Sequence, residues 1–131
     1  MRRSFDQLRA ERAYAVAAEG ANLAGFKEMA QSFPAMLQTN GLLASVAFLL
    51  AKGKPQHNRL AEALVTHLRD STFGLPVVPA GTPIQVFRYW VGMGARGPNV
   101  TGSALRRLSG EALSFAGWLK RAAEAYGGGQ E

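Results

Sequence analysis

Apolar residues recur three and four positions apart along most of the chain, which is the pattern of amphipathic helices. The clearest case is the C-terminal segment, where one seam follows a 3-4 heptad spacing through Leu105, Leu108, Ala112, Phe115, Leu119, Ala122 and Tyr126. Gly127-Gly128-Gly129 follows this seam and predicts the end of the helix. We expect Leu108, Phe115, Trp118 and Leu119 to be largely buried, since a regular seam must pack against other helices. A second amphipathic helix is predicted from about Gln56 to Asp70, where leucines recur at positions 60, 64 and 68.

The N-terminal half also consists of helix signals. Ser4-x-x-Gln7 is a capping box, and it predicts a helix from Phe5 to Glu19 that stops at Gly20. A second helix is predicted over Ala21–Ser32, and a third begins at Pro34, which suits a first helical turn, and runs to about Asn40. Asn40-Gly41 is either a turn or a break between two helical pieces, and Leu42–Ala51 is a very apolar, buried piece.

The middle of the chain carries more glycine and proline. Thr82-Pro83-Ile84-Gln85 combines an N-cap, a proline at the first helical position and a capping-box glutamine, so we expect a helix over Pro83–Met93 although Val86–Val91 has strand propensity. Loops are expected near 52–56, 71–81 and 94–102, with a flexible tail over 127–131. The sequence therefore predicts an all-α fold: one compact domain over residues 1–131, built of about five to seven helices.

Composition narrows the class of protein. A chain of 131 residues fits one domain, and the lack of cysteine excludes disulfides, thiolate zinc sites and cysteine nucleophiles. It suits a reducing compartment, so we expect a cytoplasmic protein. The longest apolar stretch, Gly41–Ala51, is too short to span a bilayer, and no membrane partner is expected.

No residue pattern indicates catalysis. His57 and His67 are not spaced as a metal pair on a helix; His67 and Asp70, at i and i+3, predict a solvated contact, with a two-ligand metal site as the weaker alternative. The carboxylates are scattered singly. Gly92-x-Gly94-x-x-Gly97 has the spacing of a dinucleotide fingerprint, but no strand is predicted before it and Pro98 follows it. We therefore expect no catalytic residue, no metal site and no cofactor.

Charge is the informative feature. The formal net charge is +6, and no acidic residue occurs between Asp70 and Glu111. These features indicate a polyanionic partner such as RNA, DNA or an acidic protein face. Any single cation could be ordinary solvated charge or could complement a helix C-terminus. As a set, the candidate phosphate contacts are Lys52, Lys54, Arg59, Arg88, Arg96, Arg106, Arg107, Lys120 and Arg121.

Two segments resemble one family. Ser32–Gly53 has a proline-initiated helix, an Asn-Gly-Leu turn and an apolar Ala-Phe-Leu helix, and Gly110–Ala125 has the pattern Ala-Leu-x-Phe-x-x-Trp-Leu-Lys-Arg. Both resemble the small helical subunit of type III-B (Cmr) CRISPR effector complexes. The segment from Asp70 to about Pro98 has no counterpart in this resemblance.

The resemblance implies a non-catalytic subunit whose copies stack beside the backbone subunits that hold the guide RNA. It implies contacts with guide RNA and target RNA through their backbones, and with the other subunits of the complex. Two other functions stay open: a free-standing basic nucleic-acid-binding protein, and a small metal-dependent nuclease, which the lack of a ligand cluster disfavours.

Overall fold

A computed structural model describes residues 4–75, 78–92 and 100–127 of the chain. Within these ranges the secondary structure is helical and no strand occurs, which confirms the all-α prediction. The elements are α1 (Phe5–Gly20), α2 (Phe26–Lys52), α3 (Pro55–Leu68), the 3-10 turn η1 (Ser71–Phe73), α4 (Pro83–Trp90) and α5 (Gly102–Gly127).

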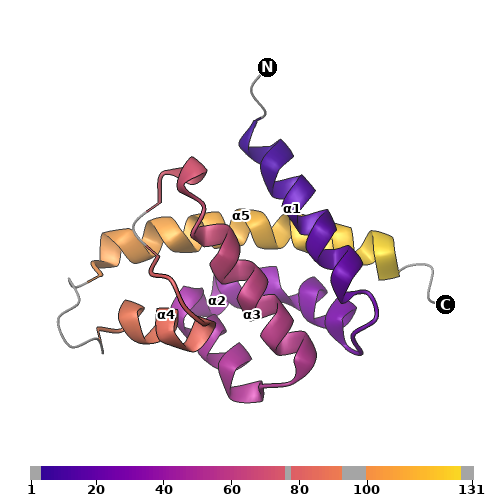
Figure 1. The fold of residues 1–131 in the computed structure, drawn as a ribbon, viewed down its shortest axis with the longest axis horizontal. Helices are drawn as coiled ribbons and strands as arrows, with labels where there is room; N and C mark the ends of the chain where they lie inside the picture. The colour runs from indigo at the N-terminus through magenta and orange to yellow at the C-terminus, as the bar shows by residue number, and fades with distance from the viewer. Residues whose placement is uncertain (1–3, 76–77, 93–99, 128–131) are drawn as a thin grey trace.

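Helix α5 runs along the long axis of the molecule (Figure 1), and α1, α2 and α3 pack against it. It packs chiefly against α2 and α1, and α3 packs against α2. α4 lies at one end of the molecule, beside α2 and α3. The largest fully buried side chains therefore come from three helices, with Phe26, Phe33 and Leu49 from α2, Leu60, Leu64 and Leu68 from α3, and Leu108, Phe115 and Leu119 from α5.

The predicted N-caps are present. Ser4 and Thr82 each accept a hydrogen bond from the amide of the third helical residue and form complete capping boxes with Gln7 and Gln85. The Thr101 hydroxyl accepts from the amide of Ala104 at 3.0 Å, and α5 begins there. These caps satisfy amides that have no partner inside the helix, so the helix starts are local features that the sequence specifies.

Helix α2 departs from the prediction in two places. It begins at Phe26 and not at Ala21, since Gly25 adopts a left-handed φ of 83° and ends a short turn after α1. It also continues through Pro34 and does not restart there, because Phe33 and Leu37 on either side are buried in the core and packing outweighs the missing hydrogen bond. The break at Gly41 is confirmed: its φ of 82° and ψ of 175° interrupt the helix, a conformation that glycine alone adopts without cost.

Other boundaries differ by a few residues. α3 begins at Pro55, so the loop expected near 52–56 is reduced to Gly53 and Lys54. α4 ends at Trp90, before the expected Met93, with Gly92 at a left-handed φ of 80°. α5 begins at Gly102 and reaches Gly127, and most of the loop expected near 94–102 and of the tail after Gly127 lies outside the described residues.

The expected core is confirmed except at its edges. Leu108, Phe115 and Leu119 are buried, whereas Trp118 is only half-buried and its indole N–H donates to the Asp6 carboxylate at 3.3 Å. Leu42–Ala51 is not buried throughout, because Phe48 faces outward with 37% of its surface exposed. Tyr126, at the end of the seam, is exposed and meets Tyr14 edge-on.

By length and hydropathy alone, α2 could cross a membrane. A single helix of this kind is weak evidence for a span, because the core helix of a soluble protein meets the same criterion. In this fold Phe26, Phe33 and Leu49 of α2 are fully buried against the other helices.

Replacing Phe115 by alanine should lower the free energy of unfolding by about 3–5 kcal/mol, because the ring is completely buried and its removal leaves a cavity. Chemical denaturation of the variant measures this. Ser114→Ala, at the exposed neighbouring position of α5, is the matched control and should change stability by less than about 0.5 kcal/mol. Equal midpoints for the two variants would contradict the packing of α5.

Candidate nucleic-acid interface

Two of the predicted cations flank the turn that joins α2 to α3. Lys52 is the last residue of α2, Gly53 makes the turn with a φ of 65°, and Lys54 is the N-cap of α3. Both lysines are exposed. The exposed ring of Phe48 lies one helical turn before Lys52, whose Nζ is 5.5 Å from the ring centroid. We call Phe48, Lys52, Lys54 and His57 the apical cluster.

His57 supports Phe48 from α3 and lies within the field of the two lysines. Its ring meets Phe48 edge-on with centroids 5.8 Å apart, and 7% of the residue is exposed. Burial is the main cause that lowers the pKa of His57, and Lys52 and Lys54 lower it further. No acidic residue occurs from position 29 to position 61, so no neighbour in the sequence offsets the positive charge of the turn.

Arg59 differs from Lys52 and Lys54 because its side chain already has a partner within the fold. It lies one turn into α3 and forms an ion pair with Glu19 of α1. Because Glu19 neutralises its charge, Arg59 is better explained as a link between α1 and α3 than as a phosphate contact.

A second group of cations lies on the last turn of α4 and the first turns of α5, which are both at the left end of the molecule in Figure 1. Arg88, in the last turn of α4, and Arg106 and Arg107, near the start of α5, are exposed. The Arg107 guanidinium donates to the carbonyl of Gly74, which fixes it against the segment after η1. Arg96 lies outside the described residues.

The third group is further along α5. Lys120 and Arg121 are exposed, and the Arg121 guanidinium lies 5.4 Å from the centroid of the Trp118 ring. The structure thus distributes the predicted cations over three places and does not gather them into one site.

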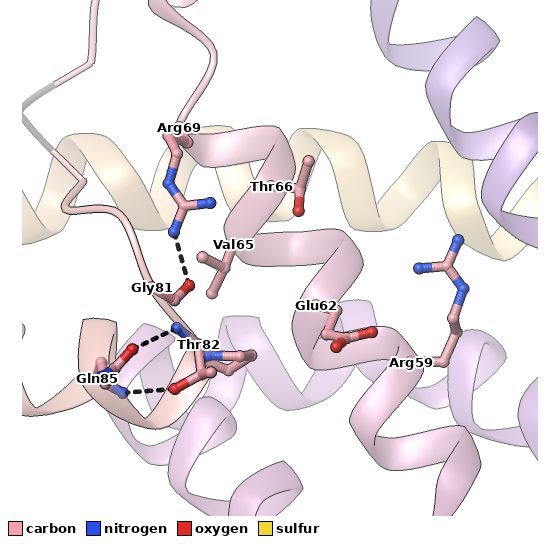
Figure 2. Close-up of a pocket in the computed structure, with 9 residues that line it drawn as sticks. Arg59, Glu62, Val65, Thr66, Arg69, Gly81, Thr82 and Gln85 are labelled. Atoms are coloured by element: carbon pink, nitrogen blue, oxygen red, sulfur yellow. Dashed lines mark hydrogen bonds between the residues drawn. The ribbon is translucent and has the colours of Figure 1, made fainter.

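A hollow of about 370 Å³ lies between α3 and the start of α4, and Figure 2 shows the residues that line it. Arg69 closes one side of it by donating to the carbonyl oxygens of Pro79 and Gly81, with the Gly81 bond at 3.1 Å. Thr82 and Gln85 on another side are engaged in the capping box. Since Arg69 bonds to Pro79 and Gly81 here, the hollow lies where the segment before α4 is held against the end of α3.

The titratable residues that come together surround a buried pair, His67 and Glu111, while Arg9, Arg12 and Asp70 are partly exposed. His67, with no exposed surface, bonds through Nε2 to Glu111 Oε2 at 2.8 Å, and Glu111 also accepts from Arg9 at 2.7 Å through each of its two oxygens. Arg12 contacts His67 Nδ1 at 3.2 Å and Asp70 at 2.8 Å. The expected solvated contact between His67 and Asp70 is wrong: the two are joined through Arg12, and His67 points into the core.

The hydrogen bonds assign the tautomer of His67. A guanidinium only donates, so Nδ1 must accept from Arg12, and Nε2 carries the hydrogen that Glu111 accepts. The ring is stacked on Phe115, with centroids 4.1 Å apart. Since no surface of His67 is exposed, a substrate cannot reach this pair, and its geometry fits a structural link between α1, α3 and α5.

Both carboxyls of this network favour the ionised form. Burial would raise the pKa of Glu111, but hydrogen bonds from Arg9 and His67 outweigh it and hold the pKa below its ordinary value. The pKa of Asp70 is lowered to about 2, first by hydrogen bonds from Thr72 and then by Arg12.

In the described part of the chain no three His, Asp or Glu residues come together as a metal site. The element before the Gly92 motif is helix α4, not the strand that a dinucleotide fingerprint requires.

Comparison with known proteins identifies the family. A sequence model of the family described as CRISPR-associated protein (Cas_Cmr5) matches residues 5–82, which is more than half of the chain. The chain belongs to the Cmr5 family. This confirms the resemblance to the small subunit of type III-B (Cmr) CRISPR effector complexes.

The fold agrees with that assignment. A crystal structure of a CRISPR-associated Cmr5 family protein from Thermus thermophilus has a similar fold, with a TM-score of 0.72 and 24% identity, over 95% of this chain and 97% of that chain. A comparison with curated protein sequences gives no significant match.

The family match and the sequence resemblance overlap only in part. Ser32–Gly53, with the Gly41 break, lies within residues 5–82 of this Cmr5 chain, whereas Gly110–Ala125 lies beyond them.

Sequence reasoning missed Phe48, Arg9 and Arg12. The signal available for Phe48 was an aromatic residue four positions before a lysine, whereas Glu111, the buried partner of Arg9, and His67, a partner of Arg12, lie 102 and 55 positions away and left no local signal.

Replacing Glu111 by glutamine should lower the free energy of unfolding by about 3–5 kcal/mol, because it removes the charge that Arg9 and His67 are arranged around. Urea denaturation measures the change. Glu124→Gln is the control on the same helix: its carboxylate is exposed and accepts from the Gln31 amide at 3.2 Å, so it should cost below about 1 kcal/mol. Equal effects of the two variants would show that Glu111 is not structurally special.

Acid should destabilise the protein through the same network. The folded-state pKa values of Glu111 and Asp70 lie below their ordinary values of 4.5 and 3.8. Their stabilisation is therefore complete above about pH 4.5 and is lost as the pH falls through the folded pKa, which for Asp70 is about 2. We expect the melting temperature to fall steeply between pH 4.5 and 2, and to fall less steeply for the Glu111→Gln and Asp70→Asn double variant. An unchanged slope would contradict the network's role.

Proposed function

We propose that this Cmr5-family chain is a non-catalytic subunit of a cytoplasmic type III-B CRISPR effector complex, and that it contacts guide and target RNA through backbone phosphates. The observation that carries this is the exposed positive charge at Lys52 and Lys54, within a stretch of chain without acidic residues. Arg88 and Arg106 add exposed cations within the second acid-free stretch.

The placement of the cations favours phosphates as their ligands. They are exposed on helix faces and at a turn, where the phosphates of an RNA backbone can reach them from solvent. Contacts of this kind position a nucleic acid and carry no sequence information. Arg59 and Arg107 contribute less, because Glu19 and the Gly74 carbonyl already occupy their guanidiniums.

The geometry also supports a role without catalysis. The histidine–glutamate pair that most resembles catalytic machinery is sealed beneath α1 and stacked on Phe115. Among the described residues no His, Asp or Glu cluster suits a metal ion. Incubating the purified protein with RNA and Mg²⁺ or Mn²⁺ tests this point, and cleavage that is abolished by a point substitution would support the nuclease alternative.

Stacking of several copies along the guide–target duplex follows from the family resemblance. With a few phosphate contacts on each copy, a single chain would have low affinity, and stacking would make the array multivalent. A free-standing nucleic-acid-binding protein would instead bind RNA or DNA strongly by itself. Co-purification of the tagged chain from its native cell, followed by identification of its partners, separates the two.

Replacing Lys52 and Lys54 together by alanine should weaken RNA binding by the assembled complex to a similar extent for all target sequences. The slope of log K against log salt should fall by about one unit for each phosphate interaction that the substitutions remove. Arg106→Ala with Arg107→Ala should act in the same direction. Stability should change little, because exposed charges contribute little to folding.

Arg59→Ala is the control for this experiment, since its charge is paired with Glu19 and its removal should leave the salt slope unchanged. If both double variants leave affinity and slope untouched, the cations are a solvated face or a protein contact and the RNA assignment is wrong. Family membership would not be affected by that result.

A further inference from the structure

We propose that the apical cluster binds an unpaired RNA nucleotide, with its base stacked on the ring of Phe48 and its phosphate held by Lys52 and Lys54. The inference takes from the proposed function only the chemical nature of the ligand. It goes beyond that function because it assigns a contact to a base, and because it requires a nucleotide that is not paired in a duplex.

The position of Lys54 is the first argument. Lys52 lies at the C-terminal end of α2, where a cation is favourable and needs no further explanation. Lys54 is the N-cap of α3, where the helix dipole disfavours a cation, and its side chain makes no capping bond. The first turn of α3 has no acidic residue to offset it. Placing a positive charge there becomes favourable when an anion occupies the site, and helix N-termini bind phosphate well.

The exposed ring of Phe48 is the second argument. Its neighbours on the outer face of α2, Ala44 and Ala51, are small and exposed, so the side of the ring is accessible. His57 packs edge-on against the ring and holds it in place. A fixed, accessible aromatic ring beside lysines is the arrangement with which proteins bind single-stranded nucleic acids, because bases stack on the ring and cations hold the backbone.

His57 supplies a third, independent observation. Its Nδ1 is buried and has no hydrogen-bond partner among the described residues. Burial and the two lysines disfavour its protonation and lower its pKa. A phosphate that neutralised Lys52 and Lys54 would remove part of that effect, so occupancy of the site should be visible at the His57 ring.

Lys52 gives the site a simple way to change on binding. In the free protein its ammonium lies 5.5 Å from the Phe48 centroid. A lysine chain is flexible, so the ammonium would leave the ring for the phosphate when a base takes its place. Bases inside a duplex are already stacked on their neighbours, and the site therefore selects a single-stranded, bulged or extruded nucleotide.

Binding of the full-length protein to a single-stranded oligouridine and to an RNA duplex of the same length tests the proposal. Phe48→Leu should lower affinity for the single strand by at least about fivefold, because one stacked base contributes about 1–3 kcal/mol, and should leave duplex binding unchanged. Phe48→Tyr keeps the ring and should bind as the parent does. Phe5→Leu is the matched control, since Phe5 is also exposed and also has a cation, Arg9, over its ring at 5.7 Å.

Two further measurements identify the contact. Irradiation with a strand that contains 5-iodouridine should cross-link to Phe48, since this base reacts with a ring that it stacks on. Titration with the strand should raise the pKa of His57, observed by NMR. Circular dichroism of each variant confirms that it is folded, which is expected because Phe48 lies on the surface.

The outcomes separate this inference from the proposed function. If Lys52→Ala with Lys54→Ala weakens binding but Phe48→Leu does not and no cross-link forms, the phosphate contacts stand and the stacking site is refuted. If neither variant changes RNA binding, by the protein alone or by the assembled complex, both fail. If Phe48→Leu releases another protein subunit while RNA affinity stays the same, Phe48 is a protein contact and the inference is overturned.

Discussion

The buried carboxylate of Glu111 determines how α1 packs against the core. An ionised carboxylate with 8% of its residue exposed is tolerated only when its oxygens are satisfied, and here Arg9 of α1 and His67 of α3 both bond to it. α1 buries only small residues, Ala13, Val16, Ala17 and Gly20, which contribute little apolar area. The ionic network therefore specifies the position of α1 more than hydrophobic contact does.

The rest of the core is held together by apolar packing and not by ion pairs. Between α2, α3 and α5 the contacts are made by large apolar side chains, and buried residues from both sides of the Gly41 break, such as Phe33 and Leu49, belong to one core. That packing is strong enough to carry the helix through Pro34. In the second half of α2 one large residue, Phe48, stays at the surface near the turn to α3.

The sequence was sufficient to predict the capped helix starts and the seam of α5, but it did not predict the start of α2 or its passage through Pro34, and it did not predict the side-chain partners. Capping boxes at Ser4 and Thr82 and the seam of α5 are local patterns, and the structure has each of them where the sequence predicts it. The sequence pairs His67 with Asp70 because only neighbours within one turn can be compared along a chain. The true partners of His67, 44 and 55 residues away, depend on how the helices cross. The partner of Arg59 cannot be predicted from the sequence for the same reason, since Glu19 lies 40 residues before it.

A cation is available to a ligand only if no group of the fold already holds its side chain. Arg9, Arg12 and Arg59 are held by carboxylates, and Arg69 by backbone carbonyls, so these arginines stabilise the fold. In the part of the chain that the structure describes, the candidate cations without a carboxylate partner lie at the α2–α3 turn, at the neighbouring ends of α4 and α5, and further along α5. A small anion could engage only one of these places. A ligand that uses all three must be extended and negatively charged along its length, as a nucleic acid strand or an acidic protein face is and a metabolite is not.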